Sequence, residues 1–460
     1  MTYYKKYLGV KIGKMLFFLI MFSTILLIFQ NVGAEPGDWW DSDWLYRKEV
    51  VVDSGFVDGD LVDFPVLVSV VDGDFVGKVQ GDGDDFVFTN ESGVVLSHEI
   101  EFFDNVTGEL VVWVRVPFVS SVDDTSLFLY YGNSVVSSQE DVLGTWVDSF
   151  QLVQHLNEEW DLGSGAFVDS SVFGHDGTLV DSDGDSFSDE GVVGDGFHFD
   201  GDADFIDVGV IDHDESISFS CWLKSDDIDD NGCAFGRYWT GYYLGTMNWG
   251  DGMLRNRVFV DSVGYEYSEG ALSDVWYHLA VTYDGGMVRF YVDGVEVGSE
   301  SVSGSLSLTD WAWHIGDVGN GALFFDGVVD EVRVSDVALS SGWIGSYVDN
   351  VLYPGDFCVV GVEEVESGFS PVVSDVVPGD GSVNVDMVPL LEASVEDVDG
   401  DEVYCELWSN ASGSWELLNS SIFYSGFGVI TGECVGMNES SVRYWWSVNC
   451  SDGSGWVNES

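Results

Sequence analysis

Short apolar runs separated by turn residues constrain the fold of this chain more than any other feature. After residue 34, runs rich in Val, Phe, Tyr and Trp alternate with clusters of Asp, Gly, Ser and Asn, about 8 to 12 residues apart. Helical periodicity is almost absent from this region. Examples of the runs are FPVLVSVV (64–71), LVVWVRV (110–116), SISFSCWL (216–223) and VWYHLAVTY (275–283). The pattern predicts an all-β protein made of several β-sandwich domains.

The net charge of −66, from 81 acidic and 15 basic residues, limits the partners of the chain. Phosphate groups would repel it, which excludes nucleic acid, and an anionic membrane surface would repel it as well. The chain should still fold, because 45% hydrophobic and 15% aromatic residues supply packed cores. Self-repulsion at this charge density predicts that salt, bound calcium or both screen the folded state.

The N-terminus has the parts of a secretory signal peptide. Four lysines within the first fourteen residues precede the apolar run MLFFLIMFSTILLIF (15–29), and Val32, Gly33 and Ala34 follow it. Cleavage after Ala34 is expected. The alternative is an uncleaved anchor, although the run is shorter than the roughly 20 residues that a spanning helix prefers. The rest of the chain is predicted to be extracellular or displayed on the cell surface.

Cysteines and glycosylation sequons agree with export. The six cysteines form no C-x-x-C pair, which favours disulfides over a zinc site. Cys221 with Cys233 is the simplest local pair, and two of Cys405, Cys434 and Cys450 are expected to pair with each other. Seven N-x-[ST] sequons occur, five of them after residue 400, at Asn90, Asn105, Asn410, Asn419, Asn438, Asn449 and Asn458.

Shifts in composition divide the chain into five segments. We predict a signal peptide (1–34), a first β-sandwich (35–147), a second and larger domain (148–352), an acidic linker (353–370) and a third domain (371–460). The final residues, DGSGWVNES, stop where one more strand would complete a sandwich, which suggests a truncated sequence or an incomplete last domain.

Two segments resemble known families, and a third has a more general resemblance. Residues 38–147 resemble the extracellular "domain of unknown function 2341" family, through WWDSDWLYRKEVVV, DFPVLVSV, GDDFVFTNESG, LSHEIEFFD, LVVWVRVPFV and TSLFLYYGN. This family has no assigned activity, so the resemblance implies a compartment rather than a chemistry. Residues 371–460 resemble fibronectin-III or Ig-like domains through the P-x-x-G-x-x-N-V string at 378–385, DVDGDEV and YWWSVNCSDGSGW.

Residues 150–350 resemble the laminin-G-like, concanavalin A-like lectin/glucanase superfamily. Five blocks in the family's order carry the resemblance: DSSVFGHDGT (169–178), GDGFHFDGDADFIDVG (194–209), SFSCWLK (218–224), WYHLAVTYDGGMVRFYVDGVEVG (276–298) and FFDGVVDEVRVSDVALSSGWIGSY (324–347). The resemblance implies a central jelly roll of two curved antiparallel sheets, a carbohydrate-binding or adhesive role and a structural calcium ion. It also places Asp169 and Asp330 where relatives share such an ion; alternatively, Asp330 caps a turn.

No catalytic constellation can be recognised. Hydrolases of this jelly roll carry E-x-D-x-x-E or E-x-D-x-E on one strand; the nearest string, Glu159-Trp160-Asp161, is followed by Gly163 and Ser164 instead of a third carboxylate. Asp330 and Glu331 are adjacent, so on a regular strand they would point to opposite faces. The seven histidines are scattered, and His278 is expected to be structural. The sequence therefore predicts a protein that is not an enzyme.

Calcium is the expected cofactor. Asp181, Asp183, Asp185 and Asp189 lie in DSDGDSFSDE, where alternate carboxylates and a glycine turn present oxygens to one point. Asp397, Asp399 and Asp401 repeat the first part of this pattern in the third domain. The alternative for both strings is a solvated acidic hairpin, a common feature of this chain.

Aromatic residues of the second domain are the candidate ligand platform. Sugars stack on exposed rings beside polar groups, and Tyr238, Trp239, Tyr243 and Trp249 lie close together in the sequence, with Tyr242, Trp311 and Trp313. Core packing is the alternative. We therefore predict a secreted or surface-displayed binding or adhesion protein that recognises glycans or surface proteins. The alternatives are an accessory region of an extracellular polysaccharide-degrading enzyme and a structural envelope protein.

Overall fold

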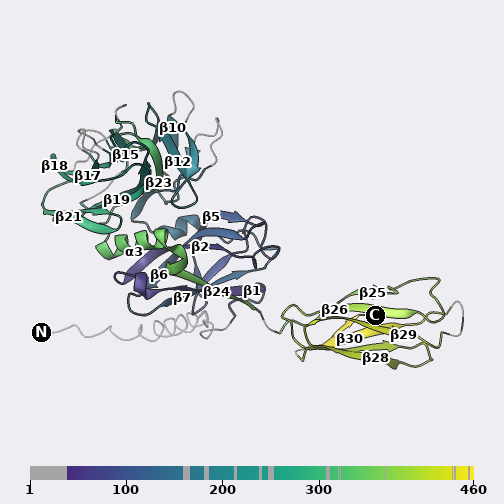
Figure 1. Cartoon of the computed structure of the whole chain (residues 1–460). Helices are drawn as coiled ribbons and strands as arrows, with labels where there is room; N and C mark the ends of the chain where they lie inside the picture. The colour runs from purple at the N-terminus through teal and green to yellow at the C-terminus, as the bar shows by residue number, and fades with distance from the viewer. Residues whose placement is uncertain are drawn as a thin grey trace, which may run out of the picture.

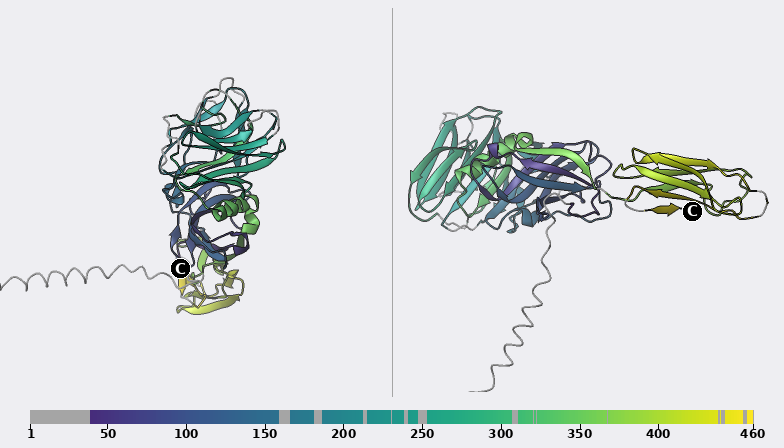
Figure 2. Two further views of the ribbon diagram at one scale, coloured as in Figure 1. Left: turned by 90° about the vertical axis from the view of Figure 1, so that its left-hand side faces the viewer. Right: turned by 90° about the horizontal axis from the view of Figure 1, so that it is seen from below.

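The computed structural model describes residues 39–158, 166–180, 186–211, 215–229, 231–237, 241–246, 253–306, 311–319, 321, 323–366, 368–437, 439, 442–453 and 456–459. Three β-sandwich domains make up this part of the chain, which confirms the all-β prediction. The first sandwich lies between the second and third domains (Figures 1 and 2). The expected signal peptide, 1–34, lies outside the described residues.

The first domain packs a five-stranded sheet, ordered β24-β1-β7-β3-β4, against a three-stranded sheet, ordered β2-β6-β5. All its strand pairs are antiparallel. Its elements in chain order are β1 (Tyr46–Val52), η1 (Ser54–Phe56), β2 (Leu61–Val71), β3 (Val87–Asn90), β4 (Val95–Leu96), β5 (His98–Asp104), β6 (Glu109–Val119), β7 (Thr125–Tyr131) and α2 (Val142–Thr145). The middle of β6, Leu110–Val114, is buried on both faces, which explains its unbroken apolar sequence.

The second domain is a jelly roll of two eight-stranded sheets. We call the sheet ordered β18-β17-β16-β15-β22-β13-β10-β9 the distal sheet. The sheet ordered β11-β12-β23-β14-β19-β20-β21, with β8 beside β23, is the proximal sheet, because its residues pack against the first domain. The strands are β8 (Phe150–Gln154), β9 (Ala166–Phe167), β10 (Gly177–Val180), β11 (Phe187–Glu190), β12 (Asp195–Asp200), β13 (Phe205–Gly209), β14 (Ile217–Ser225), β15 (Gly232–Arg237), β16 (Tyr243–Thr246), β17 (Met253–Val260), β18 (Val263–Gly270), β19 (Trp276–Tyr283), β20 (Met287–Val292), β21 (Val295–Ser301), β22 (Trp313–Ile315) and β23 (Asp326–Ser335).

The jelly roll is inserted into the first domain. After β23 the chain forms α3 (Ser341–Leu352) and α4 (Pro354–Phe357) and returns as β24 (Cys358–Val365), which pairs with β1 at the edge of the first domain's larger sheet. The Ser340 side chain caps α3 by accepting a hydrogen bond from the Trp343 amide. Helix α3 then packs on β2 (Figure 1).

The predicted acidic linker at 353–370 is therefore wrong over most of its length. Its acids suggested a solvated connection, but two of them, Glu363 and Glu364, are paired with cations of the first domain. Glu364 accepts a hydrogen bond from Arg47 at 2.7 Å, and Glu363 accepts from Lys78 Nζ at 2.5 Å and from the Tyr131 hydroxyl at 2.7 Å. An edge strand whose acidic residues pair with cations has the same amino-acid composition as an acidic linker.

One apolar core runs through the interface between the two domains. Val193, Trp222 and Phe150 of the jelly roll belong to the same buried cluster as the strands of the first domain. The proximal sheet is thus covered on both faces. In β19, as its alternation predicts, Leu279, Val281 and Tyr283 face the jelly-roll core, whereas His278 packs on Trp222 and Tyr347 at the interface.

The third domain is a seven-stranded sandwich with sheets ordered β25-β26-β29 and β28-β27-β30-β31. Its strands are β25 (Val372–Val377), β26 (Leu390–Glu396), β27 (Val403–Ser409), β28 (Glu416–Phe423), β29 (Phe427–Glu433), β30 (Trp446–Ser451) and β31 (Val457–Glu459). A disulfide joins Cys405 to Cys450, which is one of the pairings that the sequence predicted. Cys221 and Cys233 are buried free thiols, so their predicted pairing is wrong.

Candidate functional site

The predicted aromatic platform is only partly within the described residues. Tyr238, Trp239 and Trp249 lie outside them. Tyr243 is buried on β16, where its hydroxyl donates to the Gly232 carbonyl at 2.7 Å. Tyr243 therefore packs inside the domain and does not present its ring to a ligand, which corrects that part of the prediction.

The neighbouring aromatics also divide between core and surface. Tyr242 and Trp313 stack in the core of the jelly roll, with ring centroids 4.8 Å apart. Trp311 is 49% exposed, two residues before β22. A cluster in sequence thus does not form one surface, because alternation along strands sends neighbouring side chains to opposite faces.

The predicted calcium loop is also mostly outside the described residues. Asp181, Asp183 and Asp185 lie outside the described residues. So do Glu159, Trp160 and Asp161 of the rejected catalytic string. Asp189 is half-buried in β11, and one of its carboxylate oxygens accepts a hydrogen bond from the Glu190 amide at 2.8 Å. Calcium at this loop stays a prediction.

Asp169 and Asp330, the predicted shared calcium ligands, each hold a turn instead. The Asp169 carboxylate accepts from the amides of Val153, Ser171 and His175 and from the Ser171 hydroxyl, at 2.7–3.0 Å. The buried Asp330 carboxylate accepts from the amides of the turn at 192–193 and of Glu331. Both carboxylates are occupied by internal donors, so a shared ion finds no support here.

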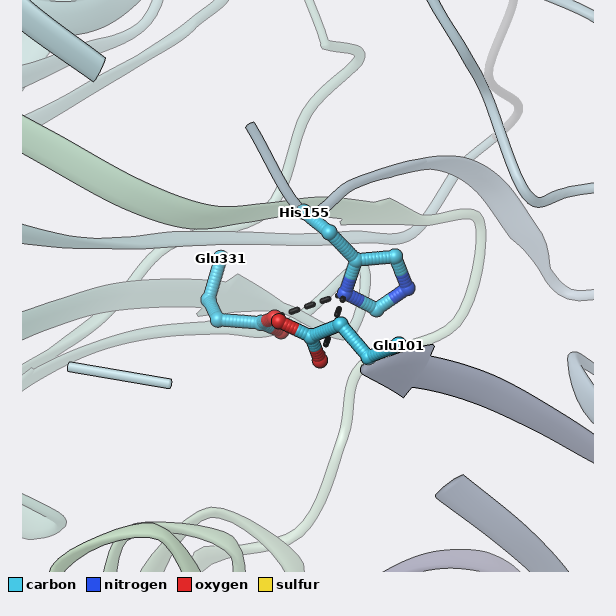
Figure 3. Close-up of side chains that lie close together, drawn as sticks. All are labelled: Glu101, His155 and Glu331. Carbon is cyan, nitrogen blue, oxygen red and sulfur yellow. Dashed lines mark hydrogen bonds and ion pairs between the residues drawn. The ribbon is translucent and has the colours of Figure 1, made fainter. Parts of the chain in front are cut away.

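A different group of ionisable side chains lies buried between the first domain and the jelly roll. Glu101 comes from β5, His155 follows β8, and Glu331 comes from β23 (Figure 3). His155 Nδ1 lies 2.6 Å from Glu331 Oε1 and 3.7 Å from Glu101 Oε2. The three side chains are only 6%, 0% and 1% exposed, in the order His155, Glu331, Glu101.

Local irregularities of the two sheets aim these carboxylates at each other. Glu101 is the extra residue of a β-bulge in β5, between Ile100 and Phe102. Glu331 lies at a bulge in β23, with a φ of 49°, where the strand changes partner from β12 to β8. Bulges redirect side chains and recur next to functional sites. The expectation that Asp330 and Glu331 point to opposite faces assumed a regular strand, and the bulge in β23 removes that regularity.

Further polar groups orient the members of this group. His155 Nε2 lies 3.4 Å from Glu99 Oε2, and Glu99 accepts from Trp146 Nε1 at 2.6 Å and from the Ser170 hydroxyl at 2.5 Å. Trp113 Nε1 donates to Glu101 Oε2 at 2.7 Å. Glu101 Oε1 is buried without a hydrogen-bond partner. It faces Gly194, whose missing side chain leaves the space, since a Cβ there would lie 3.1 Å from this oxygen.

Arg333 supplies the remaining positive charge. Its guanidinium donates to Glu331 and lies 4.4–4.6 Å from the ring centroids of Trp113, Trp146 and Tyr347. These rings come from the first domain and α3, so the arginine of the jelly roll is enclosed by aromatic side chains from across the interface. Stacking of this kind stabilises a desolvated cation.

The charges of the buried group balance. Burial raises the pKa of Glu101 to about 8, and burial together with Glu331 raises the pKa of Asp330 well above its ordinary value. Although burial opposes their ionisation, His155 holds the pKa values of Glu99 and Glu331 below the ordinary one. Despite burial, Glu331 and Glu99 raise the pKa of His155 well above its ordinary value. Near neutral pH two carboxylates and two cations are charged.

Sequence analysis missed this site, because its ionisable members come from three separate segments of the chain. Glu99 and Glu101 stand in LSHEIEFFD, and their i, i+2 spacing within a strand is the only local signal. A carboxyl group with a raised pKa beside an ionised one resembles a glycosidase pair, yet neither is exposed enough to meet a sugar. The arrangement is suited to holding a cation or to fixing the interface.

A second group with metal-ligating side chains lies nearer the surface. His198 on β12, Asp226 just after β14 and Asp326 at the start of β23 approach one another, and His198 Nε2 lies 3.1 Å from an Asp226 oxygen. These are the two groups of at least three His, Cys, Asp or Glu that could hold a metal ion in the part of the chain that the structure describes.

Fold and site together define a multidomain β-sandwich protein with a lectin-like jelly roll. Residues 200–345 match the model of the "Concanavalin A-like lectin/glucanases superfamily". Residues 82–163 match "Domain of unknown function (DUF2341)". Both resemblances inferred from the sequence are thus confirmed. No curated protein sequence matches the chain.

Solved structures match parts of the chain at low identity. Domain 4 of AbnA, a GH43 extracellular arabinanase from Geobacillus stearothermophilus, in complex with arabinotriose, is 19% identical with a TM-score of 0.35; the match covers 44% of this chain and 98% of that one. The ligand-binding domain of botulinum neurotoxin serotype D, in complex with N-acetylneuraminic acid, is 11% identical with a TM-score of 0.36, over 58% of this chain and 75% of that one. Among the described residues, no helix has the length and apolar character to cross a membrane.

Proposed function

We propose that the protein is an extracellular, non-catalytic binding protein whose jelly roll recognises carbohydrate through the outer face of its distal sheet. The observation that carries this proposal is a row of side chains across that face. Strand register places six residues side by side: Asp207, His314, Gly236, Tyr243, Arg257 and Glu266. The opposite face of the same strands builds the core.

The row offers the two kinds of contact that a sugar needs. Asp207, Arg257 and Glu266 are partly exposed and supply hydrogen-bonding groups. The Phe205 ring lies flat against His314, with centroids 4.4 Å apart, and gives an apolar surface beside them. An apolar ring next to polar groups is the usual composition of a carbohydrate site. Tyr243 stands within the row but is buried against Val318 and Leu323, so it does not contact the ligand.

Position in the molecule also supports this face. The core that joins the two domains contains residues of the proximal sheet, so the distal sheet stays away from the first domain. In Figure 1 the distal strands β15, β17 and β18 lie on the side of the jelly roll away from β2 and β5. The family match of the jelly roll to lectins and glucanases agrees with a carbohydrate ligand.

Binding of the mature protein to a glycan array tests the proposal. We expect binding to at least one glycan class, weakened at least tenfold by Asp207→Asn and by Trp311→Ala. Trp415→Ala is the matched control, because Trp415 is 51% exposed but lies in the third domain. Trp239→Ala and Trp249→Ala test the sequence prediction in the same assay. An array without any binding would contradict the proposal and favour a structural envelope protein.

We also propose calcium as a structural ion of the third domain. Asp397 is 6% exposed in the loop between β26 and β27, and both of its carboxylate oxygens lack a hydrogen-bond partner. Asp399 lies beside it and accepts hydrogen bonds from the amides of Gly368 and Phe369, just before the third domain. Both carboxylate oxygens of Asp397 and Oδ1 of Asp399 lack a hydrogen-bond partner and offer themselves to a hard cation, as the DVDGD string predicted.

A further inference from the structure

His155 Nδ1 faces two carboxylates at the interface between the first domain and the jelly roll. It lies 2.6 Å from Glu331 Oε1 and 3.7 Å from Glu101 Oε2. The Glu99 carboxylate lies 3.4 Å from the other ring nitrogen, Nε2. A ring nitrogen and carboxylate oxygens this close together are held by a proton or by a metal ion between them.

We propose that Glu101, His155 and Glu331 bind one divalent transition-metal ion, of the zinc class, which joins the first domain to the jelly roll. One ligand comes from the first domain and two come from the jelly roll. A nitrogen with two carboxylates suits zinc, cobalt or manganese, whereas calcium prefers oxygens alone. The site differs from the calcium positions considered above, and it does not depend on carbohydrate binding.

The surroundings of the three ligands are those of a metal site. Two ligands accept hydrogen bonds from other side chains, Glu101 from the Trp113 indole and Glu331 from Arg333, and the Glu99 carboxylate lies 3.4 Å from His155 Nε2. Such outer contacts orient metal ligands. In addition, the buried Glu101 Oε1 has no hydrogen-bond partner and is available to the ion. Figure 3 shows both carboxylates turned toward the same ring nitrogen.

The formal charges of the group fit one divalent ion. With a neutral His155, the carboxylates of Glu99, Glu101 and Glu331 and the guanidinium of Arg333 carry a formal net charge of −2. One divalent ion neutralises this charge. Binding therefore creates no uncompensated buried charge, which would be the main cost of placing an ion at this depth.

Metal analysis of the mature protein tests the proposal. The protein is treated with a chelator, exchanged into metal-free buffer and titrated with Zn²⁺, and with Co²⁺ for its absorption spectrum. We expect one tightly bound ion per chain, a cobalt spectrum of low coordination number, and a higher midpoint of thermal unfolding with Zn²⁺. Equal concentrations of Ca²⁺ and Mg²⁺ should not displace the ion, which separates this site from any calcium site.

Variants assign the ion to this position. Glu101→Gln keeps the size of the side chain and should weaken Zn²⁺ binding at least a hundredfold, with an unchanged near-ultraviolet circular dichroism spectrum. His198→Gln is the control, because His198 belongs to the surface group on β12, and it should leave binding unchanged. The proposal is overturned if wild-type protein binds no stoichiometric Zn²⁺, or if binding survives Glu101→Gln. Loss of binding in His198→Gln would also overturn it.

Discussion

Helix α3 completes the exposed edge of β2, and Asn350 makes the contacts that do so. β2 pairs with β6 on one side only, and on its other side the Asn350 side chain bonds both backbone groups of Leu67. Its Oδ1 accepts from the Leu67 amide at 2.7 Å, and its Nδ2 donates to the Leu67 carbonyl at 2.9 Å. Asn350→Ala removes both of these hydrogen bonds between α3 and β2.

The cost of Asn350→Ala comes from the Leu67 amide and carbonyl, which both lose their hydrogen-bond partner. A buried donor or acceptor without a partner costs about 1–3 kcal/mol, so the free energy of unfolding should fall by about 2–6 kcal/mol. That is a large part of the roughly 5–15 kcal/mol available to a folded protein. Guanidinium unfolding followed by tryptophan fluorescence measures the loss, and hydrogen exchange at Leu67 should accelerate.

Asn105→Ala is the control for this substitution, because Asn105 makes one exposed hydrogen bond, to Gly81. It should change the free energy of unfolding by less than about 0.5 kcal/mol. If Asn350→Ala costs no more than this control, the edge of β2 does not need the helix, and the reasoning is refuted.

Three further predictions concern separate parts of the chain. Burial lowers the pKa of His278 to about 3, below the roughly 6.5 of an unfolded histidine, so stability is lost as pH falls below 6.5, by up to about 1.4 kcal/mol per pH unit. His278→Gln should reduce this loss of stability at acid pH, measured as the free energy of unfolding in denaturation curves at several pH values. If wild type and variant lose the same stability as the pH falls, the prediction is contradicted. A chelator should lower the melting temperature of the third domain in wild type but not in Asp397→Asn, whereas Asp386→Asn, in an exposed turn, should respond as wild type does. Replacing Cys405 and Cys450 by serine opens a loop of 45 residues and should cost about 4 kcal/mol, measured by calorimetry; a loss under about 1 kcal/mol would show that the disulfide adds little.

The fold was predictable from the sequence because alternation along strands is a local property. The jelly roll could be recognised through five sequence blocks that stand along the chain in the order of the family. The strand at 358–365 was not predictable, because its glutamates look solvated until Arg47 and Lys78 are brought beside them. Tyr243 was misplaced since strand direction alone does not say which face other segments cover.

The buried charge group could not be predicted, for a related reason. Glu101 and Glu331 are 230 positions apart in the sequence, and each reaches the interface through a bulge that no local pattern announces. His155 has no cysteine beside it and looks like one of seven scattered histidines. Sites that form between domains depend on how the domains meet, and the insertion that decides this is itself invisible in composition.

Insertion has a mechanical consequence for the proposed binding face. The jelly roll is tied to the first domain at both ends, by the chain entering β8 and by the chain leaving β23 toward α3, and Phe150 and Tyr347 on these two connections belong to one core. With two connections and a continuous interface, the distal sheet keeps a fixed direction relative to the first sandwich. The third domain, in contrast, follows β24 through a single segment. A binding face held in one orientation loses less entropy when a ligand fixes it, so rigidity of the two-domain unit favours the affinity of the distal sheet.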